Sequence, residues 1–173
     1  MTSAGMVSAI TASTHDVFAM MVGMDVKAGE PFVDDSAGTA SGVLALLGLA
    51  GKRVGSGSVS CSADMACRIA SQMPMAEYPA INDDVLDAMA EVANMVVGNI
   101  KTKLEETLGS MALSTPTIVY GRNFETRRVG SRGWVSVPFP CEGGSVNVQI
   151  CLEAGEQSAT FRPGFALPHS VQM

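Results

Sequence analysis

The longest helical pattern in the chain covers residues 81–109, and it limits the possible folds more than any other segment. Asn82 can accept a hydrogen bond from the first free N–H groups of a helix. Asp83 and Asp84 stand where the helix dipole favours negative charge, and Gly109 can adopt the left-handed conformation that ends a helix. The sequence therefore predicts one long helix whose two ends are both specified.

The residues of this helix separate into two faces. At about 100° of rotation per residue, its apolar side chains form one stripe; they are Val85, Leu86, Met89, Val92, Ala93, Val96, Val97, Ile100 and Leu104. Asp87, Glu91, Asn94 and Gly98 form a second stripe on the opposite face. We expect this second stripe to face solvent, with the glycine leaving room for an approaching surface. Any amphipathic surface helix shows polar residues opposite an apolar stripe, so this pattern alone identifies no function.

The spacing of the polar stripe resembles a family signature. Asp87-x3-Glu91-x2-Asn94, followed after 21 residues by Pro116, is similar to the signature of the CheC/CheX/FliY family of bacterial chemotaxis phosphatases. The segments SGVLALLGLAGKRVGSGSVSCSADMACRIASQM and STPTIVYG extend the resemblance over about residues 5 to 152. The two earlier predicted helices hold no second copy of the signature, which favours the CheX-like branch.

The resemblance implies a phosphatase for a CheY-like response regulator that is phosphorylated on aspartate. The receiver would supply the acyl phosphate and its bound Mg²⁺, and this chain, expected to be a homodimer, would bind no cofactor. Asn94 would orient the attacking water, and Glu91 would pair with the receiver's active-site lysine. Asp87 and Gly98 would belong to the partner-binding surface, and Pro116 to a rigid corner. The alternative is a non-catalytic adaptor that binds a receiver or a flagellar switch component.

Shorter patterns predict the remaining elements. They are a helix over residues 3–22, a short strand near Phe32, a hairpin over 42–61, a helix over 63–72 capped by Ser62, strands over 117–124, 134–139 and 146–152, and a tail over 154–173. The first helix should turn Met21 toward the core, and the last strand should place Cys151 on its more open face. This order predicts a single α/β (α+β) domain over residues 1–153, with helices packed on a largely antiparallel sheet.

Composition excludes several classes of function. The net charge of −6 argues against nucleic acid, because phosphate contacts need clustered Lys and Arg. Gly48 and Lys52 do not complete a phosphate-binding loop, since Arg53 stands where Ser or Thr is required. A serine hydrolase lacks its Gly-x-Ser-x-Gly elbow. The histidines, His15 and His169, are too far apart along the chain to favour a zinc site.

Sequence features also bear on the compartment. The first basic residue is Lys27, so we expect no secretory signal, and the apolar run at residues 43–50 is too short to cross a bilayer. The four cysteines lie in apolar segments without a Cys-x-x-Cys pair, as expected for buried free thiols in a reducing cytoplasm. Counting alone leaves disulfides as the alternative. A hydrophobic fraction of 47% leaves apolar surface for an oligomer interface.

Overall fold

The computed structural model describes residues 2–35, 38–127 and 133–154. Its elements in chain order are α1 (Ser3–Val17), the π-helical turn η1 (Phe18–Val22), β1 (Phe32–Asp34), β2 (Gly38–Gly51), β3 (Arg53–Cys61), α2 (Ala63–Gln72), α3 (Asp83–Leu108), β4 (Met111–Leu113), β5 (Thr117–Thr126), β6 (Trp134–Cys141) and β7 (Gly144–Ala154). The predicted helices and strands are all present. The strand β4 was not predicted, and β5 continues past the predicted end at residue 124. Beyond Ala154, the predicted tail lies outside the described residues.

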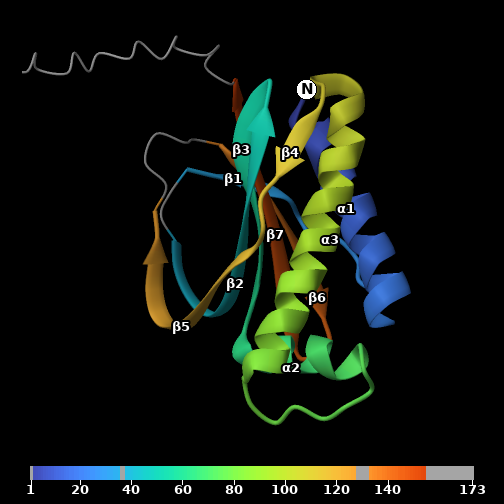
Figure 1. The fold of residues 1–173 in the computed structure, drawn as a ribbon, viewed down its shortest axis with the longest axis vertical. Helices are drawn as coiled ribbons and strands as arrows, with labels where there is room; N and C mark the ends of the chain where they lie inside the picture. The colour runs from blue at the N-terminus through green and yellow to red at the C-terminus, as the bar shows by residue number, and fades with distance from the viewer. Residues whose placement is uncertain (1, 36–37, 128–132, 155–173) are drawn as a thin grey trace, which may run out of the picture.

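The described strands form one sheet in the order β1-β6-β7-β3-β2-β4, with β5 also paired to β2. Each of these pairings is antiparallel. Figure 1 shows α1, α2 and α3 together on one side of the sheet. In this view the strands β1, β2 and β5 are the part of the sheet that lies away from α1 and α3. The predicted fold class, helices packed on an antiparallel sheet, is therefore confirmed. Among the described residues, no helix combines the length and apolarity needed to span a bilayer.

The helix α3 packs on the hairpin formed by β2 and β3. Alternate residues of β2, such as Val43 and Leu47, are buried on the helix side, and Leu44 is buried on the other side, as predicted for a strand covered on both faces. On β3, Gly57 lies directly beneath α3. A Cβ atom placed there would come within 2.7 Å of Val97 Cγ1. The missing side chain at Gly57 therefore sets how closely α3 approaches the sheet.

The first helix differs from the prediction at its C-terminal end. The segment Phe18–Val22 widens into a π-helical turn, which holds more residues per turn than an α-helix. The wider turn shifts the inward position by one residue, so Val22 is buried and Met21 is 40% exposed. The prediction that Met21 faces the core is therefore wrong.

The face of the sheet opposite the helices is less open than predicted. Ser58 Oγ donates to Gln149 Oε1 at 3.3 Å, and Gln149 Nε2 donates to Ser136 Oγ at 2.8 Å. Ser58 and Ser136 are both buried, and so is Cys151. The prediction of an open position for Cys151 is wrong, because alternation along a strand separates two faces but does not show what covers each face.

Candidate active site

The predicted ends of α3 are correct in position. Asn82 Oδ1 accepts a hydrogen bond from the Val85 N–H at 3.0 Å, and Asp83 and Asp84 occupy the first turn. At the other end, the Gly109 N–H donates to the Glu105 carbonyl at 3.0 Å. Gly109 has φ 83° and ψ 172°, so it ends the helix with a positive φ but not in the predicted left-handed helical conformation. Between these two capped ends, α3 is one continuous α-helix over Asp83–Leu108.

The polar stripe of α3 faces solvent. Asp87, Glu91 and Asn94 are exposed, and Gly98 is partly exposed. The opposite stripe is buried against the sheet and the other helices, and its members include Val85, Met89, Val92, Val96 and Ile100. The structure thus brings all four predicted site residues onto one outward surface, with a carboxylate and a carboxamide one helical turn apart.

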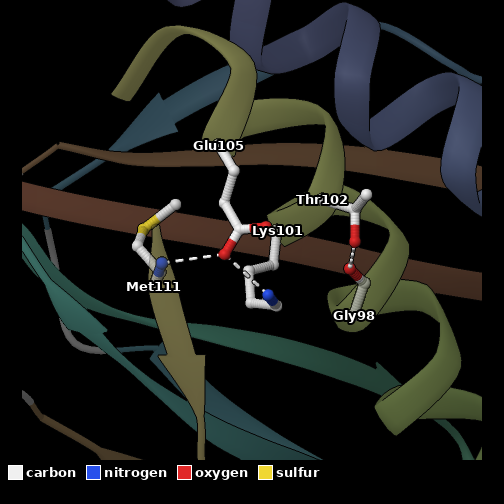
Figure 2. Close-up of polar contacts among 5 residues, drawn as sticks. All are labelled: Gly98, Lys101, Thr102, Glu105 and Met111. Atoms are coloured by element: carbon white, nitrogen blue, oxygen red, sulfur yellow. Dashed lines mark hydrogen bonds and ion pairs between the residues drawn. The ribbon is translucent and has the colours of Figure 1, made fainter. Parts of the chain in front are cut away.

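Gly98 lies beside β4 without being crowded by it. A Cβ atom placed on Gly98 would lie 3.7 Å from Leu113 Cδ2, which is an ordinary van der Waals contact. The Gly98 carbonyl accepts a hydrogen bond from Thr102 Oγ1 at 3.0 Å, as Figure 2 shows. Packing within the described chain therefore does not require a glycine at this position.

Glu105, which the sequence did not single out, fastens the last turns of α3 to β4. Its Oε1 accepts from Lys101 Nζ at 2.7 Å and from the Met111 N–H at 2.8 Å (Figure 2). The hydrogen bond from Lys101, followed by that from Met111, holds the pKa of Glu105 below its usual value. The i,i+4 spacing of Lys101 and Glu105 is visible in the sequence, but the bond to Met111 depends on where β4 lies.

Ser114 is a second residue that sequence reasoning missed. Its Oγ accepts from the Gly48 N–H at 2.7 Å and donates to the Thr115 carbonyl at 3.0 Å. The Ser114 N–H also donates to the Gly48 carbonyl at 2.9 Å. The corner between β4 and β5, which includes Pro116, is therefore fixed to β2 beside the polar stripe of α3. Pro116 comes just before the start of β5, as predicted.

The described residues bear on two kinds of mechanism, metal-ion catalysis and attack by a cysteine nucleophile. Among them, no group of three or more His, Cys, Asp or Glu side chains could hold a metal ion. None of the four cysteines, all of which lie within the described residues, forms a disulfide bond. Burial raises the pKa of Cys61 to about 12, and it also raises those of Cys67 and Cys141. Because the thiolate is the nucleophilic form, these three cysteines are poor nucleophiles at neutral pH.

A carboxylate and an amide exposed on the outside of a helix can act on a group that another protein supplies. The fold and this surface define an α/β protein with helices on one side of an antiparallel sheet, whose longest helix exposes a carboxylate and a carboxamide. The model of the family "Chemotaxis phosphatase CheX" matches residues 43–140. The chain belongs to this family, and the predicted phosphatase class is confirmed.

Individual relatives agree with this assignment. The CheY-P phosphatase CheX of Thermotoga maritima is 27% identical over 128 residues, which cover 73% of this chain and 83% of that protein. The solved structure of CheX from Desulfovibrio desulfuricans is 26% identical, with a TM-score of 0.77, over 86% of this chain and 99% of its own. A Borrelia burgdorferi structure, a CheX–CheY–BeF3–Mg²⁺ complex, is 25% identical, with a TM-score of 0.74, over 85% and 97%.

Proposed function

We propose that this chain hydrolyses the aspartyl phosphate of a CheY-like receiver by placing Glu91 and Asn94 in the receiver's active site. The observation that carries the proposal is the exposure of both side chains, one turn apart on α3, in a member of the CheX family. A related CheX has been crystallised with CheY, BeF3 and Mg²⁺, which supports a receiver as the partner. We propose the cytoplasm as the compartment, since receivers of this kind act there.

The carboxamide of Asn94 suits the orientation of water. Its carbonyl can accept a hydrogen bond from the attacking water while its NH₂ group donates to a phosphoryl oxygen. The water attacks phosphorus, the bond from phosphorus to the aspartate oxygen breaks, and inorganic phosphate leaves as the aspartate carboxylate is restored. Holding water in line in this way is catalysis by positioning. The receiver supplies the Mg²⁺ that neutralises charge on the phosphoryl oxygens.

Glu91 and its neighbours fix how the two proteins meet. Glu91 carries the negative charge that would pair with the receiver's active-site lysine, and such a pair gains strength when the interface excludes water. Asp87, one turn earlier on the same stripe, belongs to the contact surface. Gly98, one turn after Asn94, keeps side-chain atoms away from the approaching receiver.

We also propose that the protein acts as a homodimer with sheets joined across the subunits. The mean hydropathy of +0.25 is high for a chain with a net charge of −6, which leaves apolar surface to cover. Sedimentation equilibrium measures the mass directly. A monomer at micromolar concentration would contradict this part of the proposal and would leave the phosphatase assignment unaffected.

The function is tested by substituting Asn94. Asn94→Ala should slow receiver dephosphorylation by about 10²–10³, the usual cost of losing one oriented contact to the transition state. The measurement is the decay of a phosphorylated CheY-like receiver with and without the purified protein. Asn99→Ala is the matched control, because Asn99 is also exposed on α3 but points well away from the polar stripe.

The outcomes separate the two functions under consideration. Full turnover by Asn94→Ala would contradict the assigned mechanism. Tight binding of the receiver by the wild-type protein, without any faster loss of phosphate, would instead identify a non-catalytic adaptor.

A further inference from the structure

One large aromatic side chain stands exposed on the helix side of the sheet. Tyr120 is 55% exposed, and it lies on β5, which pairs with β2. In that pairing Tyr120 is directly opposite Val43, whose side chain is buried under the helices. Directly opposed residues on paired strands project to the same face. Tyr120 therefore projects to the face that carries α3, beyond the area that the helices cover.

Asn94 lies on the flank of α3 that faces β4 and β5. It precedes Gly98 by one turn, and Gly98 contacts Leu113 of β4. About three turns beyond Asn94, Glu105 on the same flank accepts a hydrogen bond from the Met111 N–H of β4. Figure 1 shows the chain running from β4, beside the upper half of α3, down to β5. The polar stripe and β5 are thus two neighbouring parts of one surface.

The distances along this surface suit a single partner. Glu91 precedes Gly98 by seven residues, about 10 Å along the helix axis. On β2, Val43 pairs with Tyr120 and Leu49 pairs with Leu113. Because Val43 and Leu49 are six residues apart, Tyr120 lies about 20 Å from Leu113 along the direction of β2. A standard interface covers about 800 Å² on each partner, a patch some 30 Å across. One receiver can therefore contact Glu91, Asn94 and Tyr120 together.

The segment from β4 to β5 is also fixed before any partner arrives. Ser114 binds Gly48 through both its Oγ and its N–H. Beyond Tyr120, Ser41 Oγ accepts from the Asn123 N–H at 3.0 Å. An ordered surface loses little conformational entropy on binding, and exposed tyrosines in ordered surfaces are frequent anchors of protein interfaces.

We propose that the receiver is held by two surfaces with separate tasks: α3 supplies the chemistry, and β5 supplies affinity through Tyr120. The proposal rests on the proposed function, because it takes the phosphorylated receiver as the occupant of the α3 surface. The Glu91 carboxylate on α3 pairs with the receiver's active-site lysine, and the Tyr120 ring covers apolar surface at the rim of the same interface.

The test separates binding from catalysis. Tyr120→Ala should raise KM for the phosphorylated receiver about tenfold while kcat stays within twofold, and Tyr120→Phe should keep KM within about threefold, because the ring is retained. Binding is measured independently with a beryllofluoride-activated receiver, whose Kd should rise about tenfold for Tyr120→Ala even when Asn94→Ala is also present.

Phe32→Ala is the matched control, because Phe32 is 46% exposed on β1, at the opposite edge of the same sheet. Unchanged KM and Kd for Tyr120→Ala would overturn the proposal. An equal rise of KM and Kd for Phe32→Ala would also overturn it. So would a Tyr120→Ala variant that changes the oligomeric mass in solution but leaves Kd for the receiver unchanged. Full turnover by Asn94→Ala would contradict the mechanism assigned under the proposed function, whereas the Kd values would still test the role of Tyr120.

Discussion

At the scale of single residues, the site depends on what each side chain of the polar stripe can do. The amide of Asn94 can accept and donate hydrogen bonds at once, whereas the carboxylate of Glu91 can only accept them when ionised. The two residues therefore suit different tasks, water orientation and charge pairing. Their exposure followed from the period of α3, because residues opposite a buried stripe must face solvent.

Gly98 offers a test of whether the receiver needs clearance on this stripe. Gly98→Ala should stabilise the protein by about 0.5–1 kcal/mol, because alanine is the better helix former and the added Cβ meets Leu113 only at an ordinary contact distance. If a receiver packs closely there, KM should rise several-fold. Thermal denaturation and the receiver assay measure the two effects. A variant that is more stable and fully active would contradict the predicted role of Gly98.

At the scale of elements, the orientation of α3 depends on contacts with strands far away in sequence. Glu105 bonds to Met111 at the start of β4, and Ser114 bonds to Gly48 in β2. Neither bond follows from local sequence patterns, and β4 itself was not predicted. A strand of three residues is too short to show an alternating pattern, so only its pairing with β2 identifies it.

The contact of Glu105 predicts a pH dependence of stability. Its pKa is lower in the folded protein than the ordinary value of 4.5. The ionised carboxylate therefore stabilises the fold above about pH 4.5, and this contribution is lost as the pH falls through the folded-state pKa. Urea midpoints should decline more steeply between pH 6 and about pH 3 for the wild type than for Glu105→Gln.

Glu106→Gln is the control for this experiment, since Glu106 is the exposed neighbour of Glu105 on the same turn. Its urea midpoints should follow those of the wild type at each pH. Parallel curves for wild type and Glu105→Gln would show that the Glu105 carboxylate contributes nothing to the pH dependence.

At the scale of the whole molecule, the sheet determines where α3 lies. Gly57 lets α3 pack close to β3, because a Cβ there would approach both Val97 Cγ1, at 2.7 Å, and Ile150 Cδ1, at 2.9 Å. The buried stripe of α3 rests on this surface, so a change beneath the helix moves Glu91 and Asn94 on its far side. We therefore expect stability and activity to change together when this contact is altered.

Gly57→Ala should therefore destabilise the fold by about 1–3 kcal/mol, the usual cost of overpacking a core. Each kcal/mol should lower Tm by about 2–4 °C in a chain of this size, and phosphatase activity should fall as α3 is displaced. Gly48→Ala is the control, because a Cβ at Gly48 meets only Ser114, at 3.5 Å. Equal Tm values for the two variants would contradict the role assigned to Gly57.

The sequence by itself determined the features that depend on local periods and end signals. These are the limits of α3, its exposed stripe with Glu91 and Asn94, the hairpin of β2 and β3, and the resemblance to a phosphatase family. Tertiary structure decided the features that depend on pairing between distant segments: the bonds of Glu105 and Ser114, the burial of Cys151 and the exposure of Tyr120. The physical reason is that a helix repeats within a few residues, whereas strand pairing and face coverage join residues that local sequence does not relate.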